Sequence, residues 1–317
     1  MSEPVLDPEI TAALAADLAV FGPRPPLSPE TLAAVRADAL ERRCVRAAAG
    51  PRMRESRDLQ ADLPGRRLRL RLHVPEGAAA SGPVLFYFHG GGWVLCSIDT
   101  HDRIMRELAA QAGCRVVAVD YRKAPEHPFP LPFDDCRDAT AWSLERANSL
   151  GIDPRRVAFG GDSAGANLAL AVGLDAAQRG AVPASVLLFY GAFGCDLETP
   201  SYRAEIGDGR FGLSRADMEM FFRWYLPPAG QSADWRAAPI KGRLDLLRRA
   251  FVLGCGLDPL RDDSRQLGAA LAQAGVGHVY RELATANHGF IALSGDVELA
   301  RGALALAAAD LREAFGS

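Results

Sequence analysis

The sequence predicts an α/β protein in which a mostly parallel central sheet is flanked by helices and carries a helical cap. Three observations predict this class. Short apolar runs rich in β-branched and aromatic residues recur along the chain, most are separated by segments with helical periodicity, and one long stretch interrupts the alternation. Continuous apolar runs are typical of strands buried on both faces of a parallel sheet, because the connecting helices cover both faces.

Composition indicates a globular protein without a nucleic-acid partner. The chain has 317 residues, 49% of them hydrophobic, which suits one large domain or two small ones with a sizeable core. Its formal net charge is −3, and acidic and basic residues are interspersed, so no nucleic-acid-binding surface is indicated. No apolar run reaches the roughly 18 residues of a membrane span, and no stable membrane anchoring is expected.

The cysteines and the first residues bear on the compartment. The six cysteines are scattered, without the spacing of zinc ligands, so we expect free thiols, a reducing compartment and no metal site. Residues 1–10 carry acidic side chains and lack the basic and apolar regions of a secretory signal. A cytoplasmic protein is therefore expected.

Residues 8–48 are predicted to form two helices separated by a stretch rich in glycine and proline at 22–26. Ser28 is a suitable N-cap for the second helix, with Pro29 at its first position. Neither helix has an obvious partner in the sheet. We therefore expect residues 1–50 to form the N-terminal part of the cap.

The next segment, 67–74, alternates arginines and a histidine with leucines and a valine. This period of two is the pattern of a half-buried antiparallel strand. We interpret the arginine side of the strand as a solvated face rather than as an anion-binding site.

The apolar runs and the helical segments between them define the predicted core, which comprises residues 51–194 and 248–317. The predicted buried strands are 84–88, 116–119, 157–159, 186–190 and 251–253. The clearest helical segments between them are 102–112, 134–148 and 164–179.

Residues 195–247 separate two strands that should be consecutive in the sheet, and they hold much of the aromatic content of the chain. A long aromatic insertion at the strand ends, where ligands bind, predicts a lid that completes the cap. The alternative is an ordinary helical excursion that completes the core. The segment 218–225 of this insertion is expected to line the substrate pocket, with Phe221, Trp224 and Tyr225 as candidates.

Gly161-Asp162-Ser163-Ala164-Gly165 fits the G-x-S-x-G turn that exposes a nucleophilic serine between a strand and a helix. Glycines are needed two residues before and after the serine because neighbouring chain passes closely there. A match of this kind alone is weak, since a chain of this length contains one by chance in roughly one case in ten.

A serine nucleophile requires a base and an acid that orients it, in the chain order Ser, Asp or Glu, His. Of the two histidines beyond Ser163, His278 lies in a predicted strand, whereas His288 follows that strand in a loop and is the better base. Asp258 is the acid nearest the end of the preceding strand. Asp262 and Asp263 are interpreted as residues that begin the next helix.

An oxyanion-binding loop is predicted at His89-Gly90-Gly91-Gly92, directly after the first buried strand. Consecutive glycines let backbone N–H groups converge on one point, together with the N–H of Ala164. A phosphate-binding loop is the alternative, but no lysine stands in the position typical of a P-loop. His89 precedes Asp258 in the chain, so we expect it to hold the glycine loop rather than to act as the base.

The chain resembles the hormone-sensitive-lipase-like (bacterial family IV type) esterases of the α/β-hydrolase superfamily from about residue 64 to its end. The motifs that carry the resemblance are His89 to Trp93, Asp120 to Pro130, Gly161 to Gly165, Asp258 to Asp262 and His288 to Phe290.

The resemblance implies the α/β-hydrolase fold and an oxyanion hole made by Gly91, Gly92 and Ala164, supported by His89 and Gly90. It also implies a two-part cap, no cofactor and a possible homodimer. Trp93 is added to the pocket candidates. Three departures from the common family pattern, at Cys96, Ala166 and Gly191, leave the triad untouched and bear on substrate range.

The predicted function is a serine carboxylesterase acting on short- to medium-chain acyl esters through Ser163, His288 and Asp258, with a small-molecule ester as its partner. Two alternatives differ from it: an amidase, lactone or carbonate hydrolase with the same triad, and a non-catalytic ligand-binding receptor. Related receptors lack the catalytic histidine, whereas His288 is present here.

Overall fold

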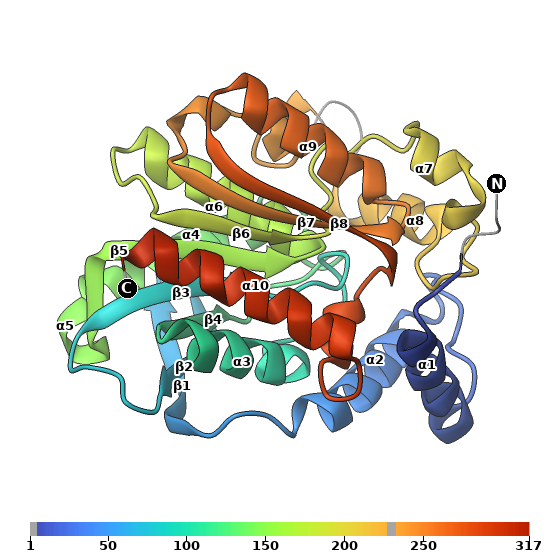
Figure 1. Cartoon of the computed structure of the whole chain (residues 1–317), viewed down its shortest axis with the longest axis horizontal. Coiled ribbons are helices and arrows are strands. Elements are labelled where there is room, and N and C mark those ends of the chain that lie inside the picture. The colour runs from blue at the N-terminus through green and yellow to red at the C-terminus, as the bar shows by residue number, and fades with distance from the viewer. Residues whose placement is uncertain (1–4, 227–232, 317) are drawn as a thin grey trace.

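The computed structural model describes residues 5–226 and 233–316, which contain one eight-stranded sheet in the order β1-β2-β4-β3-β5-β6-β7-β8 (Figure 1). β1 pairs with β2 and β2 with β4 in antiparallel fashion, and every other neighbouring pair is parallel. The strands are β1 (Met53–Leu63), β2 (Arg66–Pro75), β3 (Gly82–Phe88), β4 (Arg115–Val119), β5 (Ile152–Asp162), β6 (Ser185–Phe189), β7 (Arg249–Leu257) and β8 (Gly277–Asn287).

Helices cover both faces of the sheet, as the apolar runs predicted. In β3, Phe86 and Phe88 pack into one core cluster and Leu85 and Tyr87 into the other. α3 (Asp102–Ala112) and α10 (Glu298–Phe315) cover the second cluster, and Figure 1 shows them side by side in front of the sheet. The opposite face carries α4 (Leu131–Glu145), the short α5 (Ala147–Leu150), α6 (Ala164–Gln178) and α9 (Arg261–Gln273). In the described ranges no helix is long and apolar enough to cross a membrane.

β1 is a strand that sequence patterning did not reveal. In this strand only Leu59 and Ala61 are buried, and most other side chains are exposed or partly exposed. β1 lies at the edge of the sheet, where it pairs with β2 along its whole length. Backbone pairing with a neighbour, rather than alternating burial, therefore defines it.

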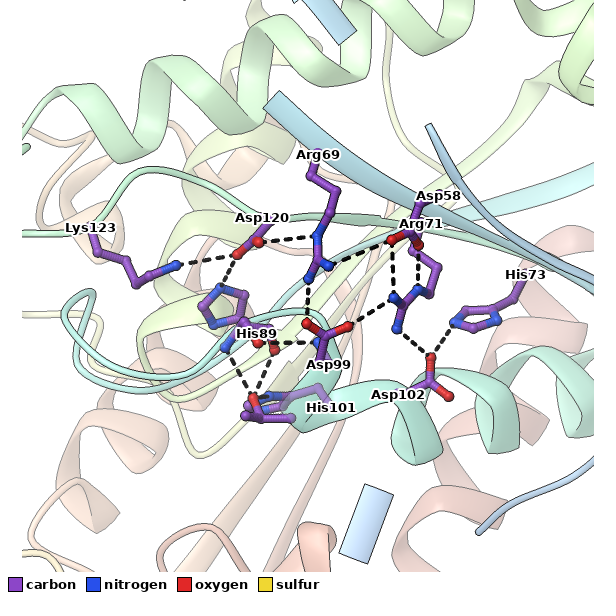
Figure 2. Close-up of polar contacts among 12 residues, drawn as sticks. Asp58, Arg69, Arg71, His73, His89, Asp99, His101, Asp102, Asp120 and Lys123 are labelled. Atoms are coloured by element: carbon purple, nitrogen blue, oxygen red, sulfur yellow. Dashed lines mark hydrogen bonds and ion pairs between the residues drawn. The ribbon is translucent and has the colours of Figure 1, made fainter. Parts of the chain in front are cut away.

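The arginine side of β2 is not a freely solvated face, which corrects the interpretation from the sequence. Arg71 Nε lies 2.7 Å from the Asp58 carboxylate, and Arg71 Nη2 lies 2.8 Å from that of Asp99 (Figure 2). Arg69 Nη2 is 2.5 Å from Asp99, and its Nε is 3.4 Å from Asp120. These carboxylates come from β1, from the segment after β3 and from the end of β4, so the periodicity of β2 alone could not reveal them.

The N-terminal helices are α1 (Pro8–Phe21) and α2 (Leu32–Ala47). Figure 1 places them on the same side of the molecule as α7 (Pro200–Arg203) and α8 (Arg215–Tyr225). α2 begins later than predicted, after Thr31 rather than after Ser28. The Ser28 hydroxyl instead bonds with the Glu30 carboxylate at 2.8 Å and with the Thr31 hydroxyl at 3.0 Å. These local bonds form a turn that precedes the helix. Residues 1–4 of the expected cap lie outside the described residues.

The insertion at 195–247 contains α7 (Pro200–Arg203), α8 (Arg215–Tyr225) and short 3-10 turns, and its residues 227–232 lie outside the described residues. Ser214 and Asp217 form a capping box that starts α8. Asn167, on α6, donates hydrogen bonds from Nδ2 to the carbonyls of Ala192 at 2.7 Å and Ala237 at 2.8 Å. The helix that follows Ser163 is thereby tied to the segment before the insertion and to the insertion itself.

Asp135, which is fully buried on α4, should be the most costly of the carboxylates paired with β2 arginines to remove. It accepts hydrogen bonds from Arg66 Nε at 2.6 Å and from Arg122 N, Nε and Nη2 at 3.0, 2.9 and 2.9 Å. We expect Asp135→Asn to lower the free energy of unfolding by about 1.5–3 kcal/mol, because it leaves the half-buried Arg122 without its carboxylate partner and Arg66 with Asp138 alone.

Asp62→Asn is the matched control, since it breaks the exposed ion pair between Asp62 on β1 and Arg67, the neighbour of Arg66 on β2. Its expected cost is about 0–1 kcal/mol. Urea unfolding of both variants measures the difference, and equal costs for the two would contradict this account.

Candidate active site

Four loops meet at the edge of the sheet where its parallel strands end. His89 follows β3, Ser163 follows β5, Asp258 follows β7 and His288 follows β8. Because these strands are parallel, their carboxyl ends lie at one edge, where ligands bind in sheets of this type.

The turn at Ser163 holds the serine in a conformation that L-residues rarely adopt, with φ 54° and ψ −122°. The backbone N–H of Ser163 donates to the carbonyl of Phe189 at 2.8 Å. A Cβ on Gly161 would lie 2.4 Å from the Phe88 carbonyl oxygen, and one on Gly165 would lie 1.9 Å from the same atom. Glycine is required at both positions because the end of β3 passes against the turn.

The structure brings together the three residues expected to form the triad. Ser163 Oγ lies 2.8 Å from His288 Nε2, and His288 Nδ1 lies 2.7 Å from Asp258 Oδ2. Asp258 is fully buried, and its Oδ1 accepts the backbone N–H of Leu260 at 2.9 Å. The Tyr190 ring packs edge-on against His288, with the ring centroids 4.9 Å apart. The imidazole is therefore held from three sides.

The alternative triad residues lie elsewhere. His278 is in β8, and its Nδ1 is 2.9 Å from the carbonyl of Val276. Asp262 and Asp263 are in the first turn of α9, as interpreted from the sequence, but they are also buried.

Asp262 holds the insertion, and Asp263 holds the residues directly before it. Asp262 accepts the backbone N–H of Ser201 at 2.8 Å, and Asp263 accepts those of Phe193 and Gly194, each at 2.8 Å. Burial raises the pKa of Asp263 to about 7 against the opposing effect of its two N–H donors. The start of α9 therefore contacts the first part of the insertion through side chains that sequence reasoning assigned only to the helix.

The glycine loop after β3 presents N–H groups without a protein acceptor. Gly91 and Gly92 adopt φ values of 116° and 61°, and within the described part of the chain their N–H groups and that of Ala164 have no hydrogen-bond acceptor. This leaves three donors beside Ser163 available to an anion.

His89 lies beneath this loop, away from Ser163. His89 Nδ1 is 2.8 Å from the Gly90 carbonyl, and the ring stacks on Tyr121 at 4.4 Å between centroids. The Tyr121 hydroxyl donates to the His89 carbonyl at 2.7 Å. Burial lowers the pKa of His89 well below its ordinary value, so the ring is neutral and suited to a supporting contact.

Asp162 is a residue to which the sequence assigned no role, and it connects the serine turn to the glycine loop. Its Oδ1 accepts the backbone N–H of Gly90 at 3.0 Å and the Tyr87 hydroxyl at 2.9 Å. Its Oδ2 lies 3.3 Å from His101 Nε2. Although burial opposes ionisation, His101, the charge of Arg43 and the Tyr87 hydroxyl hold the pKa of Asp162 below its ordinary value. The signal available in the sequence was an acidic residue inside an otherwise apolar turn.

A cavity of about 650 Å³ opens onto Ser163 between the N-terminal helices and the insertion. Of the four pocket candidates, Trp93 and Phe221 line it, whereas among the described residues Trp224 and Tyr225 do not. Tyr225 is fully buried because it stacks on Trp93, with the centroids 4.2 Å apart and the planes 2° apart. α8 can turn only one side to the cavity, and Met218 and Phe221 occupy that side.

The three departures from the family pattern have local structural correlates. Cys96 adopts φ 68°, a conformation that favours glycine. A Cβ on Gly191 would lie 2.8 Å from the Cβ of Ala166 and 2.4 Å from the Phe193 ring. The methyl group at 166 thus occupies space that a larger residue at 191 would need.

The fold and the geometry of these four loops define a hydrolase of the α/β-hydrolase class. Residues 85–292 match the family described as alpha/beta hydrolase fold. Since this match covers more than half of the chain, the protein belongs to that family, within the hormone-sensitive-lipase-like group that its motifs indicated.

Curated relatives and solved structures agree with this placement. The chain is 37% identical over 253 residues to Esterase LipI of Mycobacterium tuberculosis, covering 77% of each chain, and 35% identical over 239 residues to Ethyl acetate hydrolase of Pseudomonas putida, covering 74% of each. It is also similar to the structure of ester-hydrolase EH1AB1 from the metagenome of Lake Arreo, complexed with a derivative of bipyridine phosphonate. That similarity has a TM-score of 0.90 and 36% identity, and it covers 99% of this chain and 100% of the other.

Asp162→Ala should impair turnover through the glycine loop, because the Gly90 N–H and the Tyr87 hydroxyl would lose their buried acceptor. Loss of one oxyanion donor typically lowers kcat by roughly 10²–10³-fold. Since the loop is loosened rather than removed, we expect kcat for an ester to fall by about 10²-fold with KM nearly unchanged. Steady-state kinetics on folded protein measures both constants.

Asp99→Ala is the control, since Asp99 also follows β3 but does not contact Gly90. A decrease in kcat of similar size in the control, or an unchanged kcat in Asp162→Ala, would show that Asp162 does not act through the loop.

Proposed function

We propose that the protein is a serine carboxylesterase that hydrolyses short- to medium-chain acyl esters through an acyl-enzyme on Ser163. One observation carries the proposal: Ser163, His288 and Asp258 form a continuous hydrogen-bonded chain beside three N–H groups that have no acceptor among the described residues. Relatives named as esterases and carboxylesterases support the reaction class.

In the acylation step, Ser163 Oγ attacks the ester carbonyl and His288 Nε2 takes the serine proton. The hydrogen bond from His288 Nδ1–H to Asp258 selects the tautomer that leaves Nε2 free to accept, and the carboxylate stabilises the imidazolium. The carbonyl oxygen becomes an oxyanion and accepts hydrogen bonds from Gly91, Gly92 and Ala164. Collapse of the tetrahedral intermediate breaks the bond to the alcohol, which leaves with the proton from His288.

In the deacylation step, water replaces the alcohol. His288 takes a proton from the water as its oxygen attacks the acyl carbonyl, and the same three N–H groups stabilise the second oxyanion. Ser163 then leaves with the proton from His288, which releases the carboxylic acid and restores the enzyme. Every proton moves through His288 Nε2, and no group beyond the chain and water is needed.

The size and lining of the cavity support short to medium acyl chains. Its volume of about 650 Å³ lies within the usual range of pockets for small ligands. The walls near Ser163 carry apolar side chains from the N-terminal helices and from the insertion. They include Leu14, Leu18, Leu27, Val35, Phe211, Leu213, Met218 and Phe221.

Ser163→Ala should abolish ester turnover, because no other group can carry the acyl chain. We expect kcat to fall by roughly 10⁶-fold if the triad acts as a unit. Stoichiometric labelling of the native protein by an organophosphonate, mapped to Ser163 by mass spectrometry, is the companion measurement. Near-native hydrolysis by the variant would refute the assignment, and absent labelling of the native protein would favour a ligand-binding receptor.

Substrate specificity is tested by measuring kcat/KM for a series of 4-nitrophenyl esters from acetyl to palmitoyl, with the matching anilides for comparison. We expect kcat/KM to be highest for short to medium chains and to decline for long ones as they exceed the cavity. Anilide hydrolysis should be much slower than ester hydrolysis. A maximum at palmitoyl would contradict the chain-length proposal, and a preference for the anilides would indicate an amidase.

A further inference from the structure

Arginine side chains that the proposed mechanism does not use line the cavity. Five arginines and four aspartates line it. Each aspartate is already engaged: Asp17 pairs with Arg46, Asp38 with Arg42, Asp162 with His101, and Asp217 with Ser214. Arg210 pairs with Asp208. Among the described residues, the lining arginines without a hydrogen bond or ion pair are Arg24 and Arg43.

Arg43 lies beside the catalytic groups. It projects from α2, and its Nη2 is 3.6 Å from the position that a Cβ would occupy on Gly289, the residue after His288. The charges of Cys96 and, after it, Asp162 raise the pKa of Arg43, but the Asp162 oxygens are already bonded to Gly90, Tyr87 and His101. The guanidinium donors therefore face the cavity unsatisfied.

Arg24 stands close enough to Arg43 for their charges to interact. It is exposed at the stretch between α1 and α2 and lines the same cavity. Partial desolvation, and next the charges of Arg43 and Arg42, lower the pKa of Arg24. Two unpaired cations that repel each other are stabilised when an anion enters between them.

We propose that Arg43, assisted by Arg24, binds an ionised carboxylate of the substrate, so that this protein prefers esters that carry a second carboxylate group. The inference rests on the proposed esterase function and specifies its substrate class. A guanidinium presents parallel N–H groups that match a carboxylate in bidentate fashion, which fixes the orientation of the substrate as well as its affinity.

The carboxylate could belong to the acyl part or to the alcohol part of the ester, and paired substrates separate the two. Monoethyl adipate carries it on the acyl side, and its neutral counterpart is the ethyl ester of adipic acid monoamide. 4-Acetoxybutanoate carries it on the alcohol side, with 4-acetoxybutanamide as its counterpart. In at least one pair, the native enzyme should show a kcat/KM for the anion about 10-fold or more above that for the amide.

Arg43→Gln tests the residue. We expect the ratio of kcat/KM for the preferred anion to that for its amide to fall by about 10- to 100-fold, the range for losing a hydrogen-bonded charge. Arg43→Lys should retain part of the ratio, because lysine keeps the positive charge but lacks the parallel N–H groups of the guanidinium. Arg223→Gln, which removes an exposed arginine of α8 outside the cavity lining, should leave the ratio unchanged.

Binding to Ser163→Ala separates this proposal from the esterase assignment, because it needs no turnover. Calorimetric titration with the preferred anion should give a dissociation constant about 10- to 100-fold weaker in Ser163→Ala/Arg43→Gln than in Ser163→Ala. A native enzyme that does not favour the anion in either pair, or an unchanged ratio and affinity in the Arg43→Gln variants, would overturn the proposal. Anion binding that depends on Arg43 without any ester turnover would support the carboxylate site and refute the esterase assignment.

Discussion

The close contact between the end of β3 and the turn at Ser163 is the constraint on which the rest of the site depends. The Phe88 carbonyl passes so near Gly161 and Gly165 that neither position can carry a side chain. The same contact places the glycine loop after β3 beside the serine. Asp162 then joins the serine turn to this loop by accepting the Gly90 N–H. The nucleophile and the N–H groups expected to bind the oxyanion are thus set by one packing interaction, because both follow neighbouring parallel strands.

Charged contacts hold the two parts of the cap against this core. Arg36, on α2, bonds to both oxygens of Glu126 at 2.6 and 2.7 Å and to the carbonyls of Val94 and Ala124. Those hydrogen bonds lower the pKa of Glu126 to about 2. On the other side, Asp262 accepts the backbone N–H of Ser201 in the insertion, and Asp263 holds the residues directly before it. The cavity between them is therefore formed by elements separated by well over 100 residues in the chain, and its charges can be assigned only after the cap is in place.

Much of the fold followed from local pattern, and the exceptions share a cause. The buried runs at 84–88 and 251–253 became β3 and β7 because an apolar run covered on both sides has few other structures available to it. β1 was not predicted because pairing with β2, rather than the periodicity of its own residues, makes it a strand. The start of α2 was misplaced because Ser28 bonds within a turn, and the pairing of Arg69 and Arg71 with carboxylates depends on three distant segments.

The sequence by itself determined the buried strands with the helices between them, the family and which serine, histidine and aspartate could act together. These depend on residue type and on position after a strand. Only the tertiary structure decided what surrounds them. Asp162 bonds to the glycine loop, Tyr225 stacks on Trp93 instead of lining the cavity, and among the described residues Arg43 has no hydrogen-bond or ion-pair partner near His288. Each of these outcomes depends on which distant side chains meet, and periodicity along one segment carries no information about that.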